Sequence, residues 1–194
     1  LKGLRAMADE FGLLLIYDEV QCGMGRTGDL FAYERSDVAP DIMPLAKALG
    51  GGFPVGACLA TAKAAEHMVP GTHGSTLGGN PLAMAAANAV LDVMLAEGFM
   101  TRVQEASKRL LSGLESLVAN HGAVFESVRG RGLMLGLKCA VPNGDVVEAL
   151  ISDQMLTVVA GDNVIRLLPP LTVSDDEIDL ALVKLDAAAK ALAV

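Results

Sequence analysis

The sequence has few of the features that mark disulfide-bonded, metal-binding or nucleic-acid-binding proteins. Its three cysteines are widely spaced and form no C-x-x-C pair, which supports neither a disulfide framework nor a zinc site and favours a reducing, cytoplasmic location. The three histidines lack the spacing of metal ligands, so we expect no metal. Basic residues number 15 against 23 acidic ones, and the net charge of −8 argues against a general nucleic-acid surface.

Long apolar runs and targeting signals are also missing. A bilayer crossing needs roughly 18 apolar residues, and the best candidate, Ala83–Ala96, is interrupted by Asn88 and Asp92. No initiator methionine, signal peptide or targeting tail is present, and residues 1–8 already carry a helical apolar rhythm. We expect a soluble protein with no membrane partner, whose chain begins inside an element.

What the chain does contain is enough apolar side chains for a packed core. Hydrophobic residues make up 52% of the 194 residues and charged residues 20%. This balance is typical of a folded chain and excludes a disordered tail. The length allows one full domain or pieces of two.

The first half of the sequence alternates helix and buried strand, the pattern of an α/β domain with a largely parallel sheet. Leu1–Phe11 is predicted to be helical and to end at Gly12. The unbroken apolar run Leu13–Tyr17 predicts a strand covered by helices on both faces. A second strand is expected at Gly56–Ala60, followed by a helix that Thr61 could cap.

Two further helices are indicated by their start signals. Asn80 is a strong N-cap and the proline after it suits the first helical position, which predicts a helix over 80–97. The pair Thr101 and Gln104 has the spacing of a capping box, which predicts a helix over 101–120.

The pattern changes to short strands and hairpins in the second half. We expect two more helices there, opened by capping boxes at Asp145 and Ser174, and a turn over 161–163. The chain is therefore predicted to contain one domain over residues 1–98 and a small α+β domain over residues 99–194. The expected strands of the second domain are Val124–Val128, Leu133–Cys139, Met155–Ala160 and Val164–Leu168.

An acidic pair follows the first predicted strand. In open α/β sheets ligands bind outside the carboxyl ends of the strands, which is where Asp18 lies. The alternative is that Asp18 and Glu19 only cap the strand or begin a turn.

The next segment, residues 23–28, matches G-x-G-x-x-G. A dinucleotide fingerprint should open a helix directly, yet residues 29–40 are broken and turn-rich. The glycines are therefore expected to shape a loop, and a dinucleotide-binding oxidoreductase is the weaker hypothesis.

Lys47 lies among small and apolar residues and is followed by three glycines at 50–52. This setting is poor for a solvated charge and suits close approach of the backbone to a ligand. An amine in such a place can react with a carbonyl cofactor. The alternative is a surface lysine whose aliphatic stem packs on apolar neighbours.

Two further segments offer polar groups for ligands. Ser75 and Thr76 stand in a glycine-rich stretch just before the helix that Asn80 opens, where hydroxyls and backbone N–H groups can bind a phosphate, although the stretch can equally be a loop and a cap. Arg166 lies within a predicted strand on the same face as Val164 and Leu168, so its guanidinium needs a partner. That partner is either a substrate carboxylate or a structural salt bridge.

Taken together, these segments resemble the class III, fold-type I pyridoxal-phosphate aminotransferases, most closely their acetylornithine branch. The likeness covers nearly the whole chain and depends on several motifs in the right order. They are Ile16–Gly28, Ala46–Gly52, His73–Ala83 and Asn163–Leu171.

The resemblance implies roles around pyridoxal phosphate. Lys47 would form a Schiff base with the cofactor and move a proton between the substrate and cofactor carbons. Asp18 would pair with the protonated pyridine nitrogen, with Glu19 beside it in the cofactor-binding set. Val20 would pack against the ring, and Gln21 would approach its phenolic oxygen.

It also implies a site shared between two subunits. Thr76 would bind the cofactor phosphate of the neighbouring subunit in a homodimer, and Ser75 would lie near the substrate. Arg166 would hold the carboxylate of the amino-acid or oxo-acid substrate.

The reaction implied is transfer of the terminal amino group of N-acetylornithine to 2-oxoglutarate, a step of arginine biosynthesis. Ornithine, succinyl-diaminopimelate, 4-aminobutyrate and diaminopelargonate enzymes share most of these motifs. A non-catalytic dimerisation module is a further alternative.

In this family the phosphate-cradling loop, a ring-stacking aromatic residue and a second substrate arginine precede the segment where this chain starts. The chain is thus interpreted as a carboxyl-terminal half, inactive alone.

Overall fold

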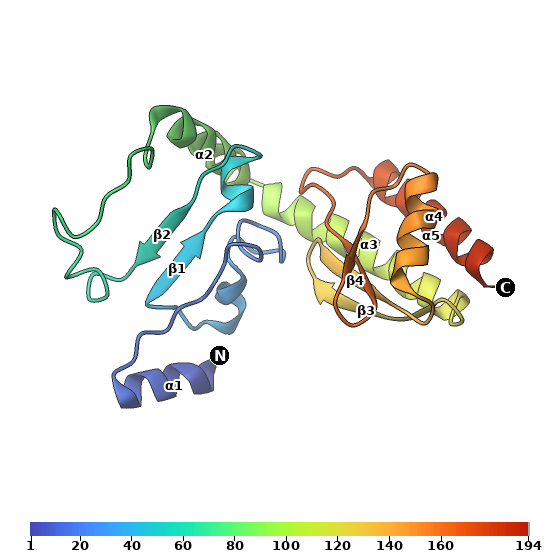
Figure 1. The fold of residues 1–194 in the computed structure, drawn as a ribbon, viewed down its shortest axis with the longest axis horizontal. Coiled ribbons are helices and arrows are strands. Elements are labelled where there is room, and N and C mark those ends of the chain that lie inside the picture. Colours follow the sequence, from blue (N-terminus) through green and yellow to red (C-terminus); the bar gives the residue numbers. More distant parts are fainter. Residues whose placement is uncertain (194) are drawn as a thin grey trace. The chain divides into compact units, whose positions relative to one another are not determined.

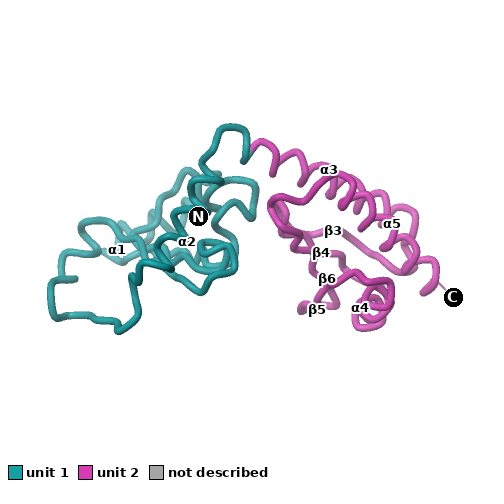
Figure 2. The backbone as a smooth tube through the Cα atoms, turned by 90° about the horizontal axis from the view of Figure 1, so that it is seen from above, with its two compact units in different colours: residues 1–100 teal, residues 101–194 magenta. Residues whose placement is uncertain are grey.

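The computed structural model describes residues 1–193 (Figure 1). Contacts within the chain divide it into two compact units, Leu1–Met100 and Thr101–Val194, which Figure 2 shows in different colours. Each unit has its own sheet.

Unit 1 contains two α-helices, two 3-10 turns and a two-stranded sheet. Its elements in chain order are α1 (Lys2–Phe11), η1 (Ala32–Ser36), β1 (Ile42–Leu45), η2 (Lys47–Gly50), β2 (Ala57–Ala60) and α2 (Pro81–Met94). Helix α1 ends as predicted at Gly12, which takes a left-handed φ of 64°. Helix α2 also begins as predicted, because the Asn80 side chain accepts a hydrogen bond from the Ala83 N–H.

The predicted parallel sheet of unit 1 is present only as a single parallel bridge, between Ile16 and Ile42. Strands β1 and β2 pair antiparallel, and β1 was not expected as a strand. The apolar run at residues 13–17 is largely exposed, with Leu13 and Ile16 each more than half exposed. The prediction of a covered strand was wrong for the described residues, because most of the side chains of this run are exposed.

One smaller prediction in unit 1 was also wrong. Residues 62–67 form turns and no helix, although the Thr61 hydroxyl does accept a hydrogen bond from the Ala64 N–H.

Among residues 1–193, no single helix is long and apolar enough to cross a membrane. Only α2 and the helix that follows it, taken together across the bend between them, pass that test.

Unit 2 is an α+β unit with a four-stranded antiparallel sheet in the order β3-β4-β6-β5. Its elements are α3 (Phe99–Asn120), β3 (Phe125–Arg131), β4 (Met134–Cys139), α4 (Asn143–Ser152), β5 (Val158–Ala160), β6 (Val164–Leu167) and α5 (Asp175–Leu192). The four strands fall within or close to the predicted ranges.

The start signals in unit 2 had mixed outcomes. Ser174 and Glu177 form the predicted capping box of α5. The box predicted at Asp145 was wrong, because α4 begins at Asn143 after Pro142 and has no side-chain cap. Helix α3 begins at Phe99, so Thr101 lies within its first turn and does not cap it.

The core of unit 2 lies on one face of the sheet. Successive residues of a strand point to opposite faces, and the pairs Leu135–Leu167 and Leu137–Ile165 are buried between β4 and β6. Side chains from the helices complete this core, and those with no more than 4% exposure include Val103, Leu110, Leu114, Val146, Leu150, Ile178 and Leu185.

Candidate active site

Backbone hydrogen bonds join the segment that ends at Asp18 to the strand that leads to Lys47. The Tyr17 N–H donates to the Ile42 carbonyl over 3.0 Å, and the Ile42 N–H donates to the Leu15 carbonyl over 3.2 Å. Because the two segments run parallel, both approach the same edge with their carboxyl ends. The structure therefore places Asp18 and Lys47 after the carboxyl ends of two neighbouring parallel segments, at the same edge of unit 1.

Asp41 reinforces this junction at the start of β1. One of its carboxylate oxygens accepts bonds of 2.8 Å from the Leu15 N–H and from the Arg5 guanidinium. The bond from Arg5, followed by the bond from Leu15, lowers the pKa of the Asp41 carboxyl. A charged carboxylate thus holds the two segments together.

Asp18 keeps most of its carboxylate available. The side chain is exposed, and one oxygen accepts a bond of 3.0 Å from the Val20 N–H two residues on. This local bond orients the carboxylate and leaves its second oxygen without a partner among residues 1–193. An oriented carboxylate of this kind suits a protonated ring nitrogen.

Glu19 differs from its neighbour because its side chain is committed to the chain itself. It is 2% exposed, and its two oxygens accept bonds of 3.0 and 2.9 Å from the N–H groups of Ala32 and Tyr33, at the start of η1. A Cβ at Gly23 would lie 2.7 Å from the Glu19 carbonyl oxygen, so the loop also needs glycine there. Glu19 therefore fixes the loop after Asp18, a structural role that sequence reasoning missed.

The glycine-rich segment 23–28 is a loop, as expected. It forms turns with left-handed φ at Met24, Gly25 and Gly28, and no helix follows it directly. A dinucleotide fingerprint requires a helix N-terminus at this point. The geometry does not provide one.

Lys47 has an unusual backbone for a lysine. Its φ is 50°, in the left-handed region, and it opens η2 immediately after β1. The expectation that Lys47 avoids solvent was wrong for the described residues, because the side chain is exposed. Its amine has no hydrogen bond or ion pair within residues 1–193. Strained backbone of this kind is concentrated at functional sites.

Ser75 and Thr76 lie in the exposed loop before α2. The Ser75 hydroxyl accepts a bond of 2.9 Å from the Gly78 N–H, which shapes the loop. Thr76 is exposed, and its hydroxyl has no partner in the part of the chain that the structure describes. The stretch is a loop with a cap, as one of the two interpretations has it, and it presents an exposed hydroxyl; phosphate binding stays a prediction.

Arg166 lies in β6, in unit 2, on the face opposite the core. It pairs in register with Gly136 on one side and Val158 on the other. Its Nε atom is buried and has no hydrogen-bond partner within residues 1–193. The structural salt bridge that was the alternative interpretation is thus missing from the described residues. A buried donor without a partner is costly, which is consistent with a site for a carboxylate.

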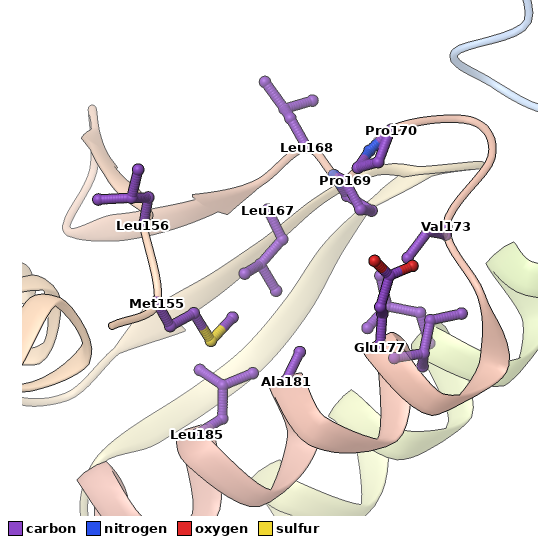
Figure 3. A pocket seen from close by; sticks show the side chains of 12 residues that line it. Met155, Leu156, Leu167, Leu168, Pro169, Pro170, Val173, Glu177, Ala181 and Leu185 are labelled. Carbon is purple, nitrogen blue, oxygen red and sulfur yellow. The ribbon is translucent and has the colours of Figure 1, made fainter. Parts of the chain in front are cut away.

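A separate cavity in unit 2 has no comparable chemistry. It measures about 250 Å³ and lies between β6, α5 and the segment before β5, as Figure 3 shows. Its single charged residue, Glu177, is bonded to Ser174 at the start of α5. Within residues 1–193, no group of three or more possible metal ligands is found.

The fold, with Asp18 and Lys47 at one edge of unit 1, is that of a known protein family. The model of the aminotransferase class-III family matches residues 1–189, and the chain belongs to that family. It is 61% identical to an acetylornithine aminotransferase of Mesorhizobium japonicum over all of this chain and 48% of that protein, and 60% identical to acetylornithine aminotransferase 1 of Bradyrhizobium diazoefficiens over 99% of this chain and 47% of that protein. The chain spans about half the length of these relatives.

Solved structures that are similar in fold also come from aminotransferases. An N-acetylornithine aminotransferase from Stenotrophomonas maltophilia is 42% identical, with a TM-score of 0.87 over 98% of this chain and 50% of that chain. An ornithine aminotransferase from Plasmodium falciparum is 31% identical, with a TM-score of 0.91 over 99% of this chain and 50% of that chain. The predicted family and its fold-type I class are confirmed.

Proposed function

We propose that this chain carries the catalytic lysine and the ring-binding aspartate of a pyridoxal-phosphate-dependent transaminase. The observation that carries the proposal is the parallel junction of Leu15–Tyr17 with Ile42, which brings Asp18 and Lys47 to one edge. In this proposal residues 1–98 are the second part of the cofactor-binding domain, and residues 99–194 are the small carboxyl-terminal domain.

The residues present fit this cofactor by their chemistry. An exposed primary amine, an oriented carboxylate and a free hydroxyl suit its aldehyde, its ring nitrogen and its phosphate respectively. When bound, pyridoxal phosphate supplies an aldehyde that condenses with amines and a ring that withdraws electrons from the reacting carbon.

The chain's own residues then bind, orient and move protons. Asp18, oriented by the bond from the Val20 N–H, would pair with the protonated ring nitrogen. Lys47 would hold the cofactor through its Nζ, and the same amine would take and return a proton at the reacting carbon. Val20 packs on the ring and Gln21 bonds its phenolic oxygen, while Glu19 positions their loop through η1.

Three residues complete the site in this proposal. The Thr76 hydroxyl donates a hydrogen bond to the phosphate bound by the partner subunit of a homodimer, and Ser75 lies close to the substrate. Arg166 binds the substrate carboxylate, which supplies the partner that its buried Nε lacks.

We infer that the amino donor is N-acetylornithine and the acceptor 2-oxoglutarate, in a cytoplasmic enzyme of arginine biosynthesis. The support is the name shared by relatives that are 53% to 61% identical, against 31% to 33% for ornithine aminotransferase structures. Because the chain spans about half of its relatives' length, we expect it to be inactive by itself.

The test is a hybrid enzyme in which this chain replaces the matching segment of the Mesorhizobium japonicum protein. We expect glutamate to form from 2-oxoglutarate fastest with N-acetylornithine, and more slowly with ornithine, succinyl-diaminopimelate and 4-aminobutyrate. Lys47→Ala should abolish turnover and leave the circular dichroism spectrum unchanged. A folded, dimeric hybrid that transfers no amino group from any of these donors would favour the non-catalytic module instead.

A further inference from the structure

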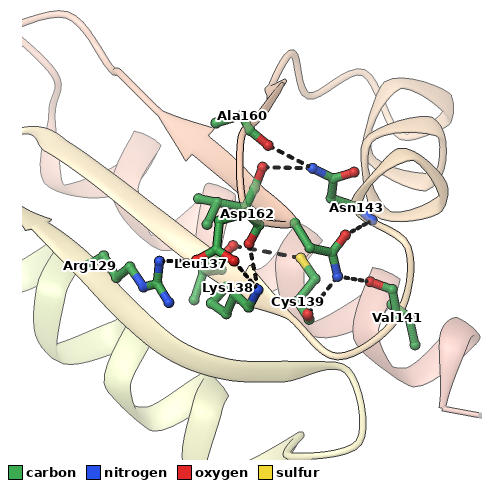
Figure 4. Close-up of polar contacts among 10 residues, drawn as sticks. Arg129, Leu137, Lys138, Cys139, Val141, Asn143, Ala160 and Asp162 are labelled. Atoms are coloured by element: carbon green, nitrogen blue, oxygen red, sulfur yellow. Dashed lines mark hydrogen bonds and ion pairs between the residues drawn. The ribbon is translucent and has the colours of Figure 1, made fainter.

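Two asparagines interlock at the turn that leads into β6. The Asn163 side-chain NH₂ donates to the carbonyls of Cys139 and Val141 over 2.7 and 2.8 Å, and its oxygen accepts a bond of 2.8 Å from the Asn143 N–H. The Asn143 side-chain NH₂ in turn donates to the carbonyls of Ala160 and Val164, on the two sides of the turn, over 3.2 and 3.0 Å (Figure 4). The turn is thereby tied to the end of β4 and to the start of α4.

The backbone of the turn explains why asparagine is suited to this place. Asp162 and Asn163 have φ values of 59° and 53°, in the left-handed region that asparagine, aspartate and glycine tolerate best. The Asn163 carbonyl also accepts a bond of 2.9 Å from the Cys139 N–H. Side chain and backbone of Asn163 therefore fix the same end of β4.

This attachment sets the register of β6, in which Arg166 is the third residue after Asn163. Val164 pairs with Lys138 and Arg166 pairs with Gly136. A slip by one residue turns every side chain of a strand to the other face. It would exchange Arg166 with Ile165, which is fully buried in the core.

The other side chain of the turn provides a contrast. Asp162 forms ion pairs with Arg129 and Lys138, on β3 and β4, and is 62% exposed (Figure 4). These cations lower the pKa of the Asp162 carboxyl, with the bond from Lys138 the largest cause. The pair with Arg129 is exposed on both sides, and exposed ion pairs contribute little to stability. Lys138 is mostly buried, but its Nζ also donates to the Asp162 backbone carbonyl, a bond that does not need the side chain. Asp162 therefore serves as a matched control at the neighbouring position.

We propose that Asn163 is a positioning residue for substrate binding, which acts by holding β6 in the register that presents Arg166 to the substrate carboxylate. This inference rests on the proposed function, because it takes Arg166 as the carboxylate-binding residue. Asn143 supports the same register from the other side of the turn.

The test compares four single variants of the hybrid enzyme: Asn163→Gly, Asp162→Gly, Asn143→Ala and Arg166→Ala. Glycine keeps the left-handed φ, so each turn variant removes only a side chain. For Asn163→Gly we expect the KM of N-acetylornithine and of 2-oxoglutarate to rise by about tenfold, the effect of one or two lost hydrogen bonds, with a smaller change in kcat. For Asp162→Gly we expect less than about a twofold change.

The other two variants test the positioning role of Asn163 and the carboxylate-binding role of Arg166 separately. Asn143→Ala should raise both KM values in the same direction and stands in for Asn163→Gly if that variant does not fold. If Arg166→Ala raises both KM values while both asparagine variants leave them unchanged, the positioning role is overturned and the proposed function stands. If Arg166→Ala itself leaves both KM values unchanged, the assignment of Arg166 fails.

Discussion

The amide of Tyr17 donates a hydrogen bond of 3.0 Å to the carbonyl of Ile42, and this bond joins the segment that ends in Asp18 to the strand that leads to Lys47. The site thus depends on a contact between residues 25 positions apart. Its side chains are local features of the sequence, but their meeting is a property of the fold.

The left-handed backbone at Lys47 predicts an effect on stability that is separate from catalysis. At a φ of 50°, alanine keeps the strain and glycine removes it. We expect Lys47→Gly to unfold at higher urea than Lys47→Ala, by about 1 kcal/mol in the free energy of unfolding, although both are inactive. Ala48→Gly, at a residue without a left-handed φ, should be destabilising. A lower urea midpoint for Lys47→Gly than for Lys47→Ala would contradict the backbone argument.

Truncation of Arg166 should affect all carboxylate substrates together. Loss of one partner of a buried, hydrogen-bonded charge pair costs about 2 to 5 kcal/mol. We expect Arg166→Ala to slow the half-reactions with N-acetylornithine and with glutamate to a similar extent, measured by stopped-flow absorbance of the hybrid. An effect on one substrate alone would show that the two do not share this carboxylate site.

The three cysteines should differ in their reaction with iodoacetamide. Cys58 is exposed, whereas Cys139 is buried and burial raises the pKa of its thiol. Burial, and then the neighbouring Glu19 carboxylate, raises the pKa of Cys22 to about 11. Since the thiolate is the reactive form, alkylation of the 194-residue chain near neutral pH should label Cys58 first.

The same experiment contains its own control. Labelling of Cys22, followed by peptide mass spectrometry, should increase as the pH rises toward 11 and should be faster in Glu19→Gln. Fast labelling of Cys22 at neutral pH would mean that Glu19 and Cys22 are not packed as described.

Asp41 should make unit 1 sensitive to acid. Its folded pKa lies below the value of about 4 expected for an unfolded aspartate, mainly because Arg5 donates a hydrogen bond to it. The unfolded state therefore takes up the proton first, and the stabilisation, complete above pH 4, is lost as the pH falls through the folded pKa. We expect Asp41→Asn to be less stable at neutral pH and to lose less stability on acidification. An unchanged acid profile, followed by circular dichroism, would remove Asp41 from this role.

Local signals in the sequence predicted some of the local structure and missed other parts, such as the caps expected at Thr101 and Asp145. Asn80 and Ser174 cap helices as expected, and the turn over 161–163 is in place, because each depends on a few neighbouring residues. The run at 13–17 was expected to be a covered strand, but strand pairing and coverage depend on distant residues, and the described chain gives it one bridge. Strand β1 was missed because Pro44 interrupts the strand pattern.

The candidate site shows the same division. Asp18, Lys47 and Arg166 could be selected from their settings and their order in the chain. The role of Glu19 could not, because its partners, the N–H groups of Ala32 and Tyr33, lie 13 and 14 positions away. Asn163 was also passed over, because its three contacts come from β4, the segment after it and α4.

The central claim is that Lys47 is the lysine that bonds to the cofactor, and borohydride trapping tests it most directly. The hybrid enzyme, loaded with pyridoxal phosphate, is reduced with borohydride, digested and mapped by mass spectrometry. The account predicts a pyridoxyl group on the Nζ of Lys47, and no label at that peptide in Lys47→Ala. A label on another lysine in the wild-type hybrid would contradict the assignment of Lys47 and, with it, the site built from the junction of Tyr17 and Ile42.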